Sequence, residues 1–272
     1  MRSASGPLGN DHRWGIVIEG KRKKLHHISF GCYPDDLPYL QERAEAAGAD
    51  LRDPPKEFES NGFWFCDPAG LLIEIKAAEK TSPAHKTSGT WSSSPEDVAG
   101  APVRAKAPIV HPRRLSHVLV FTHDIDRSLE FYSIILGLRL SDRSDRVAFM
   151  HAVHGSDHHI LAFAQSGGPG LHHCSWDMSG IDEIGLGAMH MAGKGYTKRW
   201  GLGRHVLGSN YFHYIQDPWG SYAEYSCDIG YIAVTQNWQA GYHQPEDSFY
   251  LWGPDPPADF TFNCEVEPGT LA

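Results

Sequence analysis

The feature that most constrains the fold of this chain is an internal repeat. Residues 11–30 (DHRWGIVIEGKRKKLHHISF) and 157–176 (DHHILAFAQSGGPGLHHCSW) share an Asp-His pair, an apolar segment, a polar turn and a Leu-His-His sequence before a second apolar segment. Residues 61–75 (NGFWFCDPAGLLIEI) match residues 210–225 (NYFHYIQDPWGSYAEY): each has an aromatic segment, an Asp-Pro-x-Gly turn and a segment with a glutamate. Because such periodicity marks repeated supersecondary units, the chain is expected to contain copies of one module.

The order of segments within each copy defines that module. A strand precedes a helical stretch, which is 35–49 in the first copy and 180–196 in the other, and several strands follow. A third copy begins at Leu115 with a strand and then a helix that has Asp124 or Asp126 near its N-cap. The sequence therefore predicts an α+β fold of repeated βαβββ modules, which form cupped mixed sheets.

The copies divide the chain unevenly. Complete modules are expected at about 25–78, 115–166 and 170–228, and the first is preceded only by the last strand of another. A Ser-, Pro-, Ala- and Thr-rich stretch without apolar periodicity separates the first complete module from the other two. We expect a partial N-terminal domain without metal (1–80), a linker (81–112), a C-terminal catalytic metal-binding domain (113–235) and a tail (236–272) that wraps on the main body.

Composition narrows the function classes. The 24 basic and 33 acidic residues give a net charge of −9, so neither nucleic acid nor an anionic membrane is an expected partner. No stretch approaches the ~20 apolar residues that span a bilayer, and the N-terminal residues have no apolar segment typical of a signal peptide. The five cysteines show no CxxC spacing, which argues against a cysteine-only zinc site. We expect a cytoplasmic protein.

The 17 histidines direct attention to metal ligands. His117 and His173 occupy the same position at the start of two successive modules, and Glu224 lies on the last strand of the second. Two imidazoles and one carboxylate on facing strands suit non-haem Fe(II), and the same ligands can also bind zinc. A lone histidine on a strand is more often a hydrogen-bonded core residue, but three residues at repeat-equivalent positions favour a metal site.

A long motif carries a resemblance to a known family. Residues 203–224 read GRHVLGSNYFHYIQDPWGSYAE, and this run resembles the signature of the type I extradiol catechol dioxygenases of the vicinal oxygen chelate superfamily. The matching residues are Gly203, His205, Tyr214, Asp217, Pro218, Gly220 and Glu224. His213 departs from the family, which usually has an aliphatic residue or Phe there. The resemblance covers 115–228 well and 11–78 more weakly.

This resemblance implies a set of roles. His117, His173 and Glu224 would bind Fe(II), with Mn(II) as the alternative ion. His159 matches the family's acid–base histidine beside the oxygen site, and Tyr214 matches the tyrosine that hydrogen-bonds a substrate hydroxyl.

The resemblance also implies how three further histidines are placed. His205 matches a histidine close to the metal but outside the ligand set. His172 and His158 each precede a functional histidine on a strand and are expected to face the other way.

The implied activity is iron(II)-dependent extradiol cleavage of a catechol ring with O2, the meta-cleavage used in aromatic degradation. Two alternatives remain at this stage: a catalytically impaired metal- or ligand-binding member of the same fold, and an isomerase or transferase of that superfamily. The presence of His159, His205 and Tyr214 favours the dioxygenase, because metal binding alone does not require them.

The N-terminal module lacks a partner for its repeat-equivalent residues. His27 and Glu74 correspond to His173 and Glu224, but nothing corresponds to His117, so we expect them to be structural remnants. Apolar residues of this module, including Ile28 and Phe63, need a cover that the missing strands would have supplied. We expect packing against the C-terminal domain or another chain, and a homo-oligomer. The tail segment 245–254 resembles that of some family members, and it is either a surface lid or a substrate shield.

Overall fold

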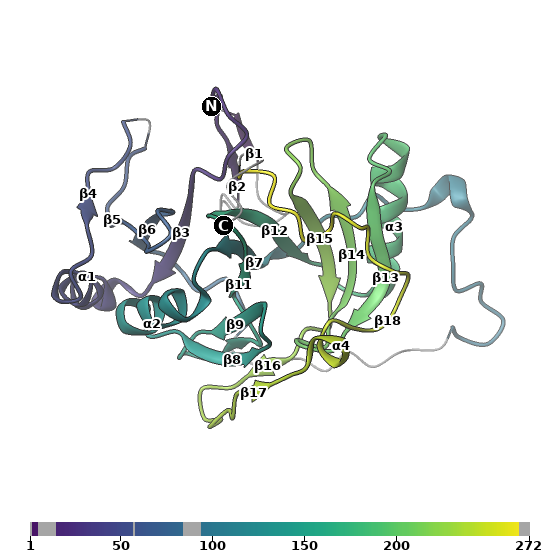
Figure 1. Cartoon of the computed structure of the whole chain (residues 1–272). Coiled ribbons are helices and arrows are strands. Elements are labelled where there is room, and N and C mark those ends of the chain that lie inside the picture. The colour runs from purple at the N-terminus through teal and green to yellow at the C-terminus, as the bar shows by residue number, and fades with distance from the viewer. Residues whose placement is uncertain (1, 5–14, 57, 84–93, 267–272) are drawn as a thin grey trace.

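The βαβββ modules fold as the repeat predicts, which confirms the fold class (Figure 1). The computed structural model describes residues 2–4, 15–56, 58–83 and 94–266. The N-terminal module comprises β3 (His27–Cys32), α1 (Leu37–Ala46), β4 (Leu51–Arg52), β5 (Phe63–Cys66) and β6 (Leu72–Ala77). The second comprises β7 (Arg114–Thr122), α2 (Ile125–Leu136), β8 (Arg139–Arg143), β9 (Val147–His151) and β11 (Leu161–Gln165). The third comprises β12 (Gly170–Asp177), α3 (Ile181–Gly193), β13 (Arg199–His205), β14 (Tyr211–Gln216) and β15 (Tyr222–Cys227).

Short elements connect and extend these modules. They are β1 (Arg2–Ala4), β2 (Gly15–Val17), η1 (Pro34–Asp36), η2 (Arg104–Lys106), β10 (Ser156–Asp157), β16 (Tyr231–Ile232), β17 (Gly241–Tyr242), α4 (Pro245–Ser248) and β18 (Tyr250–Trp252). The strand expected before the N-terminal module exists as β2, but it pairs with β1 and not with the module's sheet. Residues 11–14 of the repeat lie outside the described residues.

Local sequence explains the boundaries of α2. Of the two aspartates expected near its start, Asp124 is the N-cap, since its Oδ1 accepts the backbone N–H of Arg127 at 2.9 Å. Gly137 ends the helix with φ 69°, a left-handed conformation that glycine adopts without a Cβ penalty. Between these ends, Ile125, Tyr132 and Ile135 are buried. The helix therefore presents one apolar face to the core.

The two C-terminal modules share one sheet of ten strands, in the order β17-β8-β9-β11-β7-β12-β15-β14-β13-β18. Antiparallel pairing of β7 with β12 joins the modules at the centre of the sheet. The tail contributes a strand at each edge, because β17 pairs with β8 and β18 pairs with β13. The tail thus forms both edges of the sheet, which are β17 and β18 (Figure 1).

The N-terminal module finds its expected cover within the chain. Its four-stranded sheet, β3-β6-β5-β4, has the order of β12-β15-β14-β13 in the third module. Phe63, Phe65 and Ile73 share a buried core with Tyr132 and Phe163 of the second module, and α1 lies beside α2 (Figure 1). The Tyr132 hydroxyl also donates a hydrogen bond to buried Asp67 Oδ2 at 3.1 Å. These contacts cover the apolar face.

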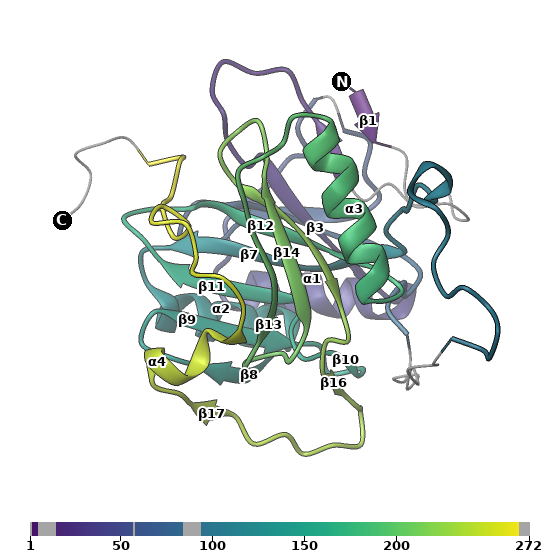
Figure 2. The same cartoon turned by 90° about the vertical axis from the view of Figure 1, so that its right-hand side faces the viewer.

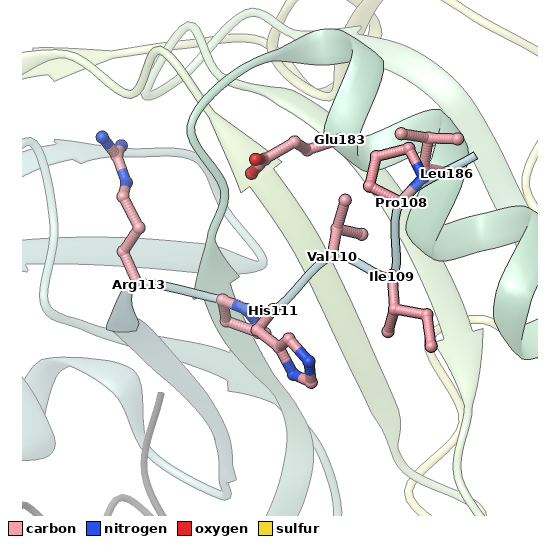
Figure 3. Close-up of a pocket in the computed structure, with 8 residues that line it drawn as sticks. Pro108, Ile109, Val110, His111, Arg113, Glu183 and Leu186 are labelled. Atoms are coloured by element: carbon pink, nitrogen blue, oxygen red, sulfur yellow. The ribbon is translucent and has the colours of Figure 1, made fainter. Parts of the chain in front are cut away.

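The described part of the linker, 81–83 and 94–112, contains only η2 as regular structure. Its last residues run along α3, where Pro108, Ile109 and Val110 border a hollow of about 320 Å³ together with Glu183 and Leu186 (Figure 3). Val110 packs against a buried cluster beneath the helix. No helix in the described ranges is long and apolar enough to cross a membrane.

His213, the departure from the family motif, is buried on β14. It pairs with Tyr225 on β15, which contacts α3 at Gly187, so its ring lies on the side of the sheet that α3 covers. Its Nε2 has no hydrogen-bond partner among the described residues. Burial, and then the nearby charge of Arg199, lowers the pKa of His213 to about 4.

This burial predicts acid sensitivity. Between pH 6.5 and about 4 the unfolded chain protonates His213 while the folded chain does not, so the free energy of unfolding falls as the pH drops. Replacing His213 by Phe removes this loss, and the stability of the variant relative to the wild type should rise by about 2 kcal/mol between pH 7 and pH 5. Urea denaturation at the two pH values measures the difference. Exposed His123→Gln is the control, and parallel curves for His213→Phe and wild type would refute the prediction.

Candidate metal centre

Three side chains from three adjacent strands point to one place in the centre of the ten-stranded sheet. His117 lies on β7, His173 on β12 and Glu224 on β15, and all three are buried. Their ligand atoms lie within 4.8 Å of one another. Glu224 Oε2 is 3.1 Å from His117 Nε2 and 3.6 Å from His173 Nε2, and the two imidazole nitrogens are 3.3 Å apart. The structure therefore brings together the three residues that the repeat singles out.

Strand register explains the convergence. Ser175 of β12 lies opposite His117 on the antiparallel neighbour β7 and beside Glu224 on the parallel neighbour β15. His173 precedes Ser175 by two residues and so shares its face of the sheet. Ser175 is small and fully buried, and its hydroxyl is bonded to the hydroxyl of Ser226. Ser175 therefore leaves space between the strands for the larger side chains of His117, His173 and Glu224.

The ligand set suits a divalent cation. Glu224 Oε1 accepts a hydrogen bond from Asn210 Nδ2 at 2.9 Å, whereas buried Oε2 makes no hydrogen bond in the described structure. Burial acts to raise the pKa of Glu224, but His117, His205 and Ser175 together outweigh it and hold the pKa below its ordinary value. Burial, and then His172 and His117, holds the pKa of His173 well below its ordinary value. A buried carboxylate oxygen without a hydrogen bond thus faces two imidazole nitrogens, and these three atoms are a ligand set that a cation such as Fe(II) would bind.

The three other predicted site residues surround this centre. The ring of His159 lies 4.1 Å from that of His117, and the ring of Tyr214 lies 5.1 Å from that of His173. His205 Nε2 is 2.9 Å from the Tyr214 hydroxyl and 3.8 Å from Glu224 Oε1. Burial and the negative charge of Glu224 raise the pKa of Tyr214 well above its ordinary value, so the phenol keeps its proton.

The histidines that precede the functional ones make a different set of contacts. His172 Nδ1 is 2.7 Å from His173 Nδ1, and its ring packs against Phe260. His158 Nδ1 is 3.0 Å from His159 Nδ1, and its Nε2 is 2.7 Å from Asp142 Oδ2. Neither ring belongs to the cluster of ligand atoms. Each one contacts Nδ1 of the functional histidine that follows it.

The sequence did not indicate two residues near the site. Asn210 lies within the long motif, between the matched residues His205 and Tyr214, and its position there is the one available signal. Asp142 lies on β8 outside any motif, and only the fold brings it to His158.

The N-terminal module repeats half of this arrangement. Ser29 lies beside Glu74 in the parallel pair β3–β6, as Ser175 lies beside Glu224. Ser29 Oγ donates a hydrogen bond to Glu74, and the ammonium of Lys76 lies 3.0 Å from the same carboxylate. Burial acts to raise the pKa of Glu74, but Ser29, Ser60 and Lys76 together outweigh it and lower the pKa. A lysine thus supplies the positive charge that this carboxylate faces.

Comparisons with known proteins agree with this geometry. Residues 114–225 match the family model described as the Glyoxalase/Bleomycin resistance protein/Dioxygenase superfamily. The chain is 50% identical over 254 residues to metapyrocatechase 2 of Cupriavidus necator, covering 93% of this chain and 79% of that protein. It is 30% identical over 156 residues to an iron-dependent extradiol dioxygenase of Rhodococcus jostii, covering 52% of this chain and 50% of the relative.

A solved structure supports the fold. The Mn(II)-bound glyoxalase from Novosphingobium aromaticivorans superposes with a TM-score of 0.64 at 25% identity, covering 86% of this chain and 73% of that one. With half of its residues identical to a metapyrocatechase over most of both sequences, the chain belongs to the type I extradiol catechol dioxygenases of the vicinal oxygen chelate superfamily.

Proposed function

We propose that this extradiol catechol dioxygenase uses Fe(II) held by His117, His173 and Glu224 to cleave a catechol ring with O2. The observation that carries the proposal is the convergence of two imidazole nitrogens on a buried carboxylate oxygen without a hydrogen bond. The impaired binding protein and the isomerase or transferase are not favoured, given the similarity to a metapyrocatechase.

Iron is favoured by the iron-dependent relative from Rhodococcus jostii, and Mn(II) is the alternative because the neighbouring glyoxalase structure holds it. When bound, the divalent ion supplies a Lewis-acidic centre with open positions that two adjacent hydroxyl groups of a catechol can chelate. Asn210 holds the other carboxylate oxygen of Glu224 and so orients the ligand atom.

His159 is suited to move protons. Its Nδ1 is engaged by His158, so Nε2 is the nitrogen left to exchange a proton with the substrate. Burial, and then the neighbouring His117 and His158, lowers the pKa of His159 well below its ordinary value. The ring is therefore neutral near pH 7, and it can accept a proton from a catechol hydroxyl and return it to the product.

Tyr214 and His205 orient the substrate. The Tyr214 hydroxyl keeps its proton. Burial lowers the pKa of His205, and the neutral ring donates from Nδ1 to the Phe249 carbonyl, so its Nε2 accepts the Tyr214 O–H and the phenol oxygen can accept a hydrogen bond from a catechol hydroxyl. His205 Nδ1 lies 2.8 Å from the carbonyl of Phe249, which fixes the ring beside Tyr214. Trp200 packs against Tyr214 and Phe212 packs against His205, and Tyr214 is buried among these rings.

The remaining proposals concern location and partners. We propose a cytoplasmic enzyme, which is supported by five cysteines that are all unpaired thiols. The partners are the catechol and O2, and neither nucleic acid nor membrane is among them, which is consistent with the negative net charge.

We also propose a homo-oligomer. The N-terminal module is covered within the chain, but β18 is an edge strand that exposes Leu251 and Trp252.

If the exposed edge forms a subunit contact, Leu251→Lys should shift the protein toward monomer. Sedimentation equilibrium of the wild type should show a dimer or larger assembly. Val234→Lys, which replaces an equally exposed apolar residue elsewhere, should leave the assembly unchanged. A wild type that is monomeric at every concentration would exclude the homo-oligomer.

Removing any one ligand should abolish iron binding, because two protein ligands do not hold the ion. Protein purified without oxygen should contain about one Fe(II) per chain, whereas His117→Ala, His173→Ala and Glu224→Ala should contain none. His27→Ala is the matched control, since His27 is the repeat equivalent of His173. Iron retained in His173→Ala but lost in His172→Ala would mean that the wrong member of the pair had been chosen.

Replacing His159 by Phe should leave iron and catechol binding nearly intact and lower turnover by about 10²–10⁴-fold, the contribution typical of a positioned proton-transfer group. Tyr214→Phe removes one hydroxyl and should have a milder effect, shared between binding and turnover, with His205→Ala between the two. Iron content, thermal midpoint and single-turnover oxygen consumption are measured on each variant. Equal loss of stability in all three, without a specific kinetic change, would mean that they are only core residues.

A further inference from the structure

A continuous row of contacts leads from His159 to the C-terminal tail. His159 Nδ1 lies 3.0 Å from His158 Nδ1, and His158 Nε2 lies 2.7 Å from Asp142 Oδ2. The second oxygen of Asp142 accepts the backbone N–H of Gly241 at 2.7 Å and lies 3.1 Å from His243 Nε2. His158, His159 and Asp142 are all buried. The mechanism above uses only His159 from this row.

The chemistry of the row sets the proton positions. A carboxylate only accepts hydrogen bonds, so the contact with Asp142 places a proton on His158 Nε2 and leaves Nδ1 of the neutral ring as an acceptor. His159 Nδ1 must then be the donor, and His159 Nε2 carries the lone pair. This is the tautomer that a base needs if it takes a proton from a substrate hydroxyl through Nε2.

The tail holds Asp142 in place. β17 pairs with β8 at the edge of the sheet (Figure 2). In this pair Gly241 of β17 lies opposite Asp142 of β8. Trp238 Nε1 donates to the carbonyl of Ser141 at 2.7 Å, and the Ser141 hydroxyl donates to the carbonyl of His158 at 2.5 Å. Gly241 leaves room for these contacts, because a Cβ there would lie 2.9 Å from Asp142 Oδ1 and 2.6 Å from His243 Nε2 and would displace both side chains.

We propose that Asp142 and tail residues 238–243, together called the tail clasp, position His159 through His158 and fix its tautomer. Asp142, His158 and Gly241 are therefore positioning residues for the ring-cleavage reaction. The inference rests on the proposed function, in which His159 transfers protons. It assigns to this part of the tail a role other than that of a lid or shield.

A double-mutant cycle with His159→Phe tests the tail clasp. Asp142→Asn and Gly241→Ala should each lower kcat by about tenfold or more, with iron content and the KM for catechol close to those of the wild type. In the His159→Phe background neither substitution should lower kcat further, because the residue on which they act is gone. Gly185→Ala on α3 is the matched control, since a Cβ there meets nothing within 4 Å.

The outcomes separate the two proposals. Normal turnover in His159→Phe itself would overturn the proposed function and this inference with it. A large loss in His159→Phe, with normal turnover in folded Asp142→Asn and Gly241→Ala, would overturn the inference alone. An equal further loss of kcat in both backgrounds would also overturn it, because the clasp would then act through general stability. If Asp142→Asn does not fold, the kcat of Gly241→Ala tests the inference, because Gly241 lies on β17 at the edge of the sheet.

Discussion

The antiparallel pairing of β7 with β12 is the interaction on which the site depends. It joins two modules into one sheet and places His117 beside strands that already carry His173 and Glu224. The N-terminal module shows the importance of this pairing, because β3 and β6 keep the same register but have no strand equivalent to β7. There, Lys76 lies against the buried carboxylate of Glu74. A module alone therefore provides two of the three ligand positions.

Repetition explains how much of this molecule was predictable. The modules, the order of elements along the chain within each one and the grouping of His117, His173 and Glu224 all follow from patterns that recur within the sequence. Asp142 could not be found in this way, because it lies outside any motif and its partners in the tail are about a hundred residues away, in a segment that has no repeat equivalent. Sequence alone also left open whether the N-terminal module packs on its own chain or on another.

Paired histidines share a common physical role in the two C-terminal modules. His173 and His159 each contact the Nδ1 atom of the histidine that precedes them. In both cases the preceding ring is then bonded to a group outside the pair: His172 to the backbone of Phe260, and His158 to Asp142. The preceding ring thus places a hydrogen-bond acceptor behind the functional ring, both on strand β12, which holds His172 and His173, and in the loop before β11, which holds His158 and His159.

The contact between the N-terminal module and α2 has a consequence for folding. Phe63 and Phe65 share one buried core with Tyr132, and Asp67 accepts a hydrogen bond from the Tyr132 hydroxyl where the two modules meet. Neither side buries its apolar surface without the other, so the N-terminal module and the second module form a single cooperative unit. A local opening on one side of this contact exposes the core of the other, and thermal fluctuations that separate the two cost a large part of the global free energy of unfolding.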